Sequence, residues 1–187
     1  MSKGTIPVLW LCGPPGVGKS TVGWAIYSQL VQSGLQTAYV DIDQLGICYP
    51  APTADPGRYQ MKARNLGRVV ANFRAEGARC LVVSGVIDPS ACVPVDEIPQ
   101  GLVTVCLLRA GHEDLIQRFV DRGSPAGQIQ RVLQEAADLD ASTVADVRVD
   151  TTGLPVAEVV RQVYVRTGGW PALRHSPCTG CTPTAIS

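Results

Sequence analysis

The stretch GPPGVGKST, residues 13–21, sets three glycines beside a lysine and two hydroxyl side chains. Glycines allow successive backbone N–H groups to point inward, and Lys19 adds a positive charge next to them. The Ser20 hydroxyl is a ligand of the kind that Mg²⁺ accepts together with phosphate oxygens. Because an apolar run precedes the stretch and a helical pattern follows it, we predict a phosphate-binding loop for Mg²⁺ and ATP. The residues expected to contact the nucleotide here are Gly13, Pro14, Pro15, Gly16, Val17, Gly18, Lys19, Ser20 and Thr21.

Two aspartates follow a second apolar run, in YVDIDQL at residues 39–45. Asp41 and Asp43 lie at the carboxyl end of a predicted strand, which in an open parallel sheet borders the ligand crevice. We expect Asp41 to hold Mg²⁺ with Ser20, and Asp43 to accept a proton from a substrate hydroxyl or to orient that hydroxyl. Two carboxylates that only cap a loop are the alternative.

Arginines with helical spacing occur in two places. Arg64 and Arg68 share one face of the helix predicted at 58–76, and of the two we favour Arg64 as a contact to the acceptor. Arg118 and Arg122 lie one turn apart on a later predicted helix, where two guanidiniums would neutralise charge on a transferred phosphoryl group and close as a lid. Solvent-exposed arginines are the alternative in both places.

The end of the third apolar run separates classes of nucleotide-binding protein. Ser84 and Gly85 stand where a motor-type ATPase would carry an aspartate, and the guanine-binding sequence Asn-Lys-x-Asp of a GTPase is missing from the chain. Both observations favour a kinase over these hydrolases. We expect the loop at Ser84 and Gly85 to line the acceptor pocket.

Composition limits the partners to be considered. The chain has 187 residues, which suits one domain with a substantial core. Sixteen basic and sixteen acidic side chains give no net charge, so overall charge does not attract the chain to nucleic acid or to an anionic membrane. The sequence has no signal-peptide pattern and no apolar run of membrane-spanning length. We therefore expect a cytoplasmic monomer or homodimer without a nucleic-acid or membrane partner.

The cysteines fall into two groups. Cys12, Cys80 and Cys106 lie in apolar runs, where a free cysteine behaves as a small hydrophobic residue, and we expect them in the core. Cys178 and Cys181 form a C-x-x-C in a tail rich in Pro, Thr and Gly, but no second pair completes a zinc site. We favour a loose tail over a metal or redox role.

Strand-like and helical patterns alternate along the chain. The strands are expected at 5–12, 37–42, 78–86, 102–109 and 145–150, and the helices at about 18–33, 58–76, 111–122, 125–139 and 155–166. Continuous rather than alternating apolarity in the strands predicts a parallel sheet covered on both faces, with right-handed crossovers. We expect one domain over residues 1–167 with a lid at about 111–140, followed by a tail at 168–187.

The chain resembles the small P-loop kinases over about residues 5–166. The likeness is found in the loop GPPGVGKST, in the segments VDIDQLG and VDTTGLPVAEVV, and in the arginine-bearing lid. Adenylylsulfate kinases are the most similar group, with shikimate, gluconate and chloramphenicol kinases more distant. The resemblance implies a three-layer α/β P-loop NTPase fold, with a five-stranded parallel sheet in the order 2-3-1-4-5 and helices on both faces.

The same resemblance implies roles for single residues. It gives Asp41 to magnesium, Asp43 to the acceptor hydroxyl and Arg64 to the substrate. It also implies phosphate contacts by Arg118 and Arg122, and it places adenine near Thr152, Gly153 and Pro155. The expected function is transfer of the γ-phosphoryl group of Mg·ATP to a hydroxyl of a metabolite, nucleotide or antibiotic. A regulatory nucleotide-binding protein or slow NTPase is the alternative, and the acceptor is not named by the sequence.

Overall fold

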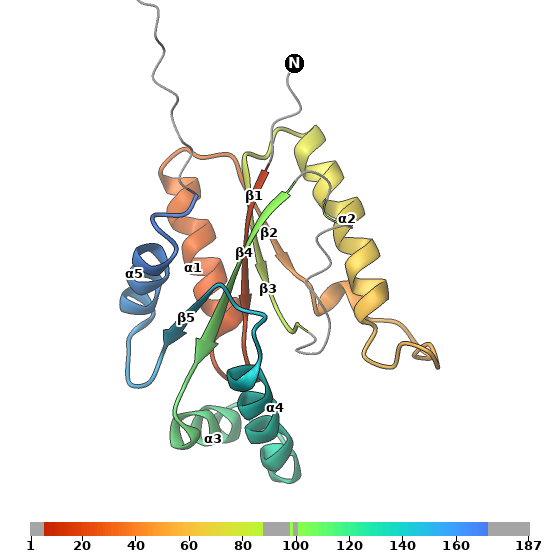
Figure 1. Cartoon of the computed structure of the whole chain (residues 1–187), viewed down its shortest axis with the longest axis vertical. Coiled ribbons are helices and arrows are strands. Elements are labelled where there is room, and N and C mark those ends of the chain that lie inside the picture. The colour runs from red at the N-terminus through yellow and green to blue at the C-terminus, as the bar shows by residue number, and fades with distance from the viewer. Residues whose placement is uncertain (1–5, 88–97, 99–100, 172–187) are drawn as a thin grey trace, which may run out of the picture.

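The computed structural model describes residues 6–87, 98 and 101–171, and within them it contains a five-stranded sheet (Figure 1). The strands are β1 (Ile6–Cys12), β2 (Thr37–Asp41), β3 (Cys80–Ser84), β4 (Gly101–Arg109) and β5 (Val147–Asp150). They lie in the order β2-β3-β1-β4-β5, and every neighbouring pair is parallel. The predicted fold class and strand order are therefore confirmed.

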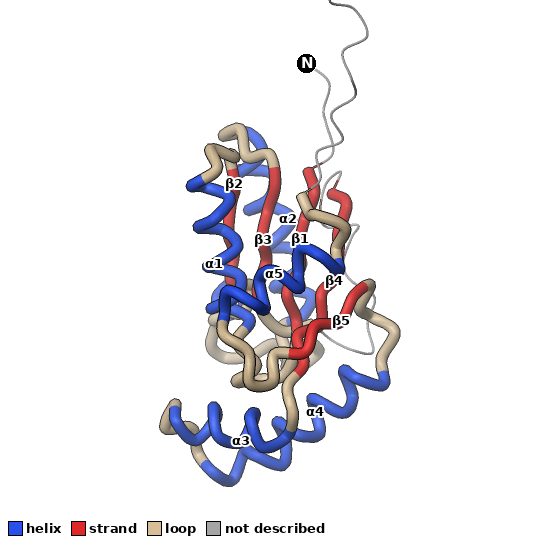
Figure 2. Tube along the Cα trace, turned by 90° about the vertical axis from the view of Figure 1, so that its left-hand side faces the viewer, coloured by secondary structure: helices blue, strands red, loops and turns tan. Residues whose placement is uncertain are grey.

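Helices surround this sheet and complete the predicted three layers. Helices α1 (Lys19–Gln32) and α5 (Val156–Arg166) cover one face, and α2 (Tyr59–Ala75) covers the other (Figure 1). Helices α3 (His112–Asp121) and α4 (Ile129–Ala141) lie beyond the carboxyl ends of the strands (Figures 1 and 2). Two short 3₁₀ turns, η1 (Gln44–Gly46) and η3 (Ala126–Gln128), join these elements.

The core is divided between the two faces of the sheet. In β1, Val8 and Trp10 belong to the apolar cluster that includes Leu66 of α2. Leu9 and Leu11 of the same strand belong to the opposite cluster, which contains residues of α1 and α5. Alternate residues of one strand thus pack on opposite layers, and each is almost completely buried. This double burial explains why the strands are continuously apolar in the sequence.

Three cysteines occupy the predicted core positions. Cys12, Cys80 and Cys106 are buried and free. Burial raises the pKa of the Cys12 and Cys106 thiols to about 12, so neither forms a reactive thiolate near neutral pH. The prediction of a core role is confirmed for these three. Cys178 and Cys181 lie outside the described residues.

The parallel arrangement brings the ends of several strands to one edge of the sheet. The loop after β1 leads into α1, β2 ends at Asp41 and β3 ends at Ser84. The segment after β5 begins at Thr151, whose N–H bonds the Arg109 carbonyl at the end of β4. This edge therefore collects most of the residues for which the sequence predicts chemistry. Among the described helices none is both long and apolar enough to cross a membrane.

Candidate functional site

The loop between β1 and α1 has a backbone that only glycine adopts easily. Gly13, Gly16 and Gly18 have φ angles of 146°, 85° and 104°. A Cβ atom at Gly13 would overlap the Leu108 carbonyl oxygen of β4. Gly18 is the N-cap of α1, so the loop opens directly onto the positive end of the helix dipole. The glycine spacing seen in the sequence is therefore required by the conformation of the loop.

Lys19, the first residue of α1, turns its side chain back onto this loop. Its Nζ donates hydrogen bonds to the carbonyl oxygens of Gly13 at 2.8 Å and Pro14 at 3.0 Å. Protein atoms surround the ammonium, and this burial lowers its pKa, while the charge of Asp43 opposes the shift. A partly buried ammonium beside the N-terminus of a helix suits an anion such as a phosphate.

Ser20 and Asp41 form the second part of the site. Ser20 Oγ donates a hydrogen bond of 2.9 Å to Asp41 Oδ2, and Asp41 Oδ1 accepts the backbone N–H of Asp43 at 3.1 Å. The described residues contain no group of three or more His, Cys, Asp or Glu side chains that could hold a metal. One hydroxyl and one carboxylate at this distance fit Mg²⁺, which takes few protein ligands when phosphates and waters supply the rest.

Asp43 forms an ion pair with a residue that the sequence analysis did not select. Lys62 Nζ lies 2.9 Å from Asp43 Oδ1, and the exposed fractions of the two side chains are 12% for lysine and 43% for aspartate. On the other side of the carboxylate, a Cβ atom at Gly85 would lie 3.2 Å from Asp43 Oδ2. The structure thus places Asp43 between α2 and the end of β3. Gly85 lies beside Asp43, as two residues that line one pocket would.

Glu135 of α4 adds a second carboxylate near the phosphate loop. It lies three residues after Val132 and four before Leu139, both almost fully buried, so it is on the inward side of the helix. The next residue, Ala136, lines a small cavity together with Pro14. Burial raises the pKa of Glu135, and the opposite charge of Lys19 offsets part of the rise. The inner face of α4 therefore presents a half-buried acid to the charged centre of the site.

A cavity of about 260 Å³ lies on the opposite side of the loop, between α3 and the start of α5. Gly16 and Thr21 line it from the phosphate loop and first helix, and Arg122 lines it from the C-cap of α3. Leu154 and Val156, which alternate with the predicted adenine residues Gly153 and Pro155, also line it. The cavity thus adjoins the segment for which the resemblance implied contact with adenine.

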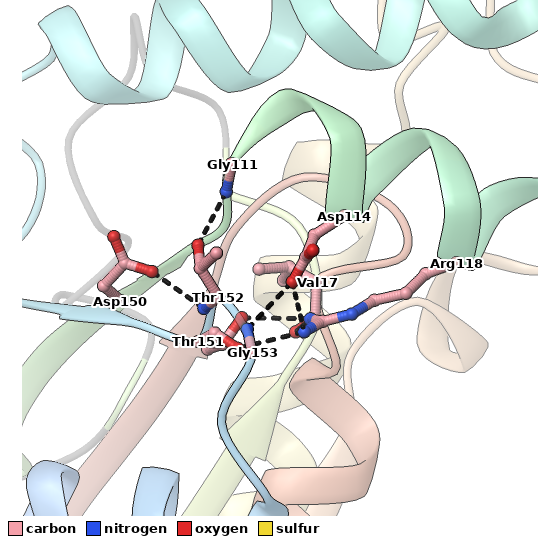
Figure 3. A network of polar contacts seen from close by, with 8 residues as sticks. All are labelled: Val17, Gly111, Asp114, Arg118, Asp150, Thr151, Thr152 and Gly153. Carbon is pink, nitrogen blue, oxygen red and sulfur yellow. Dashed lines mark hydrogen bonds and ion pairs between the residues drawn. The ribbon is translucent and has the colours of Figure 1, made fainter.

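Arg118 links three parts of the chain beside this cavity (Figure 3). Its Nη1 donates to Val17 O at 3.3 Å and Thr151 Oγ1 at 3.0 Å. Its Nη2 donates to Thr151 O at 2.9 Å and to Asp114 Oδ2 at 3.1 Å. The same Asp114 oxygen accepts the Gly153 N–H, and Thr152 Oγ1 accepts the Gly111 N–H. Arg118 is therefore bonded to protein beside the cavity that Leu154 and Val156 line, and its contact with a transferred phosphoryl group stays a prediction.

Two of the predicted acceptor residues are not brought to Asp43. Ser84 is fully buried, and its Oγ hydrogen bonds Tyr39 Oη at 2.7 Å on the side of the sheet that faces α1. This geometry gives no support to a substrate contact through its side chain. Arg64 is exposed on α2, two residues after Lys62, so it projects from a different side of the helix than the lysine that reaches Asp43.

Sequence reasoning missed Lys62, Glu135 and Thr151. One signal for Lys62 was present, because the chain has only three lysines, at positions 3, 19 and 62. Glu135 lies among several acidic residues of one helix, and its approach to the phosphate loop depends on how α4 packs. Thr151 is 2% exposed, and its carbonyl and hydroxyl matter only because Arg118 reaches them.

A family model described as an AAA domain matches residues 9–140. Adenylyl-sulfate kinase of Enterobacter sp. (strain 638) is 31% identical over 116 residues, which are 61% of this chain and 52% of that protein. The chain therefore spans about half the length of this curated relative.

Solved structures with a similar fold include several small kinases. A tunicamycin resistance protein of Deinococcus radiodurans has a TM-score of 0.65 at 21% identity, over 87% of this chain and 96% of that chain. A gluconokinase of Sinorhizobium meliloti 1021 has a TM-score of 0.59 at 22% identity, over 89% and 94%. A shikimate kinase of Bacteroides thetaiotaomicron has a TM-score of 0.62 at 14% identity, over 86% and 98%. The resemblance to small P-loop kinases is thereby confirmed, and at these identities the structures establish the fold.

Proposed function

The chain belongs to the AAA-domain family, and on that premise we propose that it is a kinase that transfers the γ-phosphoryl group of Mg·ATP to a hydroxyl of a small molecule. The observation that carries the proposal is the arrangement of Lys19, the Ser20–Asp41 pair and the half-exposed Asp43 at one edge of the sheet. Phosphate binding needs only Lys19 and the Ser20–Asp41 pair. Asp43 adds a carboxylate that a second substrate can reach. The fold shared with gluconate and shikimate kinases supports phosphotransfer in general.

In the proposed reaction the protein contributes mainly position and charge. The acceptor oxygen forms a bond to the γ-phosphorus while the bond from that phosphorus to the bridging oxygen breaks, and ADP leaves. The hydroxyl proton passes to Asp43, or Asp43 orients the hydroxyl and the proton leaves later. Lys19 stabilises the negative charge that moves onto the β- and γ-phosphate oxygens. Magnesium, when bound through Ser20 and Asp41, supplies further charge neutralisation on the phosphates.

Other predicted residues complete the proposed site. The backbone N–H groups of residues 13–21 bind the phosphates, and the cavity beside Thr21, Arg122 and Leu154 receives the adenosine. Helices α3 and α4, within the predicted lid at about 111–140, close over the nucleotide and exclude water. Residues 1–167 form the catalytic domain. Arg64 contacts the acceptor only if the acceptor extends beyond the side of α2 that carries Lys62.

The proposal is tested by ADP release from Mg·ATP with purified protein, alone and with pooled metabolite fractions, with mass spectrometry to find a product that has gained a phosphoryl group. Release that depends on one fraction, with a phosphorylated product, is the expected result. Release that no fraction alters, or tight ATP binding without any transfer, would favour the regulatory nucleotide-binding protein or slow NTPase instead.

A further inference from the structure

The Lys62 side chain reaches Asp43 along a path that passes close to the backbone of η1. Its stem crosses Gly46 of η1, where a Cβ atom would lie 2.6 Å from Lys62 Cε and 2.8 Å from Lys62 Cγ. The ammonium lies 5.6 Å from the centre of the Tyr59 ring and ends on Asp43 Oδ1. A side chain at position 46 would therefore force the lysine stem to move away from this path.

The connection between η1 and α2 is held at more than one point. Asn65 Nδ2, three residues after Lys62 on the helix, donates 2.8 Å to the Leu45 carbonyl oxygen. The start of α2 is fixed in turn by Asp55, whose carboxylate accepts the N–H groups of Tyr59 at 2.7 Å and Met61 at 3.2 Å. Lys62 therefore projects from a helix whose position relative to η1 is set independently of the ion pair.

The two carboxylate oxygens of Asp43 have different surroundings, because only Oδ1 takes part in the ion pair. Among the described residues the only side chain that donates to Asp43 is Lys62, and it uses Oδ1. Oδ2 lies on the Gly85 side, at the carboxyl end of the sheet. Charged groups that face the aspartate from other elements are Lys19 of α1 and Glu135 of α4, and neither has a hydrogen bond to it.

We infer that Lys62 is a positioning residue: it fixes Asp43 through Oδ1 so that Oδ2 meets the acceptor hydroxyl, and Gly46 leaves room for the path of the lysine. The inference rests on the proposed function, since Asp43 is the group that the acceptor meets. Lys62 itself contacts neither the nucleotide nor the reacting atoms. A misplaced carboxylate lowers kcat roughly tenfold to a hundredfold, because a shift of about 1 Å at a reacting group has effects of this size.

The test compares four single variants and one double variant, Gly46→Ala with Lys62→Met, with the wild-type protein in the acceptor-dependent assay. Lys62→Met removes the charge and keeps the length of the stem, while Lys62→Arg keeps the charge. Gly46→Ala displaces the lysine side chain without replacing the lysine. Arg79→Met is the matched control, because it removes one exposed positive charge at the opposite end of β3.

Lys62→Met is expected to lose kcat with little change in KM for ATP, Lys62→Arg to lose less, and Arg79→Met to match the wild type. Gly46→Ala is expected to lower kcat as well, but to have no further effect in a protein that already carries Lys62→Met. Wild-type kcat in Lys62→Met would overturn the inference, as would fully additive losses in the double variant. Circular dichroism of each variant identifies any that fail to fold.

Failure of the proposed function gives a different result. If the wild-type protein transfers phosphate to no acceptor, the kinase proposal fails while the position of Asp43 can still be measured. A crystal structure of Lys62→Met then decides: an altered Asp43 rotamer supports the positioning role, and an unchanged carboxylate contradicts it.

Discussion

Replacement of Arg118 by methionine tests whether the hydrogen bonds of Arg118, beside the cavity that Leu154 lines, stabilise the fold. Methionine keeps an apolar stem of similar length but removes all four hydrogen bonds of the guanidinium. Two of these go to Thr151, which is only 2% exposed, so its carbonyl and hydroxyl oxygens would lose their donor inside the protein. The α3 helix, the phosphate loop and the segment after β5 would no longer be joined at this point.

The cost of this change follows from the burial of the partners. A hydrogen bond from a charged donor contributes about 1.5–3 kcal/mol, whereas a partly exposed ion pair such as that with Asp114 contributes under about 1 kcal/mol. The Arg118 side chain is 30% exposed, so water would replace part of the lost interaction. We expect a net loss of about 2 kcal/mol. For a domain of this size, such a loss lowers Tm by roughly 4–8 °C.

The assay is thermal unfolding followed by circular dichroism or calorimetry, with Arg122→Met as the control. Arg122, the C-cap residue of α3, lies four residues after Arg118 and lines the same cavity, but it has no hydrogen bond to another described residue. Its replacement is expected to change Tm by less than about 2 °C, as for most exposed substitutions. An equal Tm for Arg118→Met and Arg122→Met would refute the reasoning, because the network would then contribute nothing to stability.

Three further substitutions address the charged centre. Lys19→Met should abolish turnover without lowering Tm, because it removes a phosphate ligand and also an ammonium whose burial is unfavourable; a stable variant with wild-type turnover would contradict this. Asp43→Asn should leave the Kd for ATP nearly unchanged and lower kcat by roughly 10²–10⁴, measured by calorimetry and by ADP release. Glu135→Gln should stabilise the protein at pH 7 but not at acidic pH. Because the folded protein raises the pKa of Glu135, the stability that the acid contributes is complete below its ordinary value of 4.5 and is lost as pH rises through the higher folded value. The measurement is unfolding in urea at several pH values. A difference in the free energy of unfolding between variant and wild type that does not change with pH would contradict this reasoning.

The parts of the fold that could be predicted depend on short-range patterns. The phosphate loop is contiguous, and its glycines are needed by the local backbone, so residues 13–21 could be assigned without any knowledge of packing. The strands were recognisable because burial on both faces makes each run apolar, and the position of Asp41 follows from where β2 ends. Periodicity and turn residues act over a few neighbours, and these are visible in one sequence.

The contacts that could not be predicted join distant residues. Lys62 is 19 positions from Asp43, and Arg118 is 33 positions from Thr151. An amphipathic helix pattern says which face is buried but not which flanking side chain meets a neighbouring loop. For the same reason Arg64 was favoured among the arginines of this helix and Lys62 was not considered: the arginine has the chemistry of a substrate clamp, but the lysine is the residue that reaches Asp43. Ser84 was expected in the pocket because it ends a strand, yet at that position its side chain points to the α1 layer.

The two sides of the site have different support in the fold. The nucleotide side is built from the ends of β1, β4 and β5 and is joined by Arg118, so its geometry depends on the central sheet. Asp43 instead depends on η1 and α2 at the β2 edge, through single contacts such as that of Lys62. Contacts at the edge strand can change without disturbing the sheet, so under the proposed function acceptor specificity is expected to depend on this edge and nucleotide binding on the central strands. Substitutions at Lys62 and Gly46 should accordingly alter turnover of the acceptor and leave the affinity for ATP unchanged.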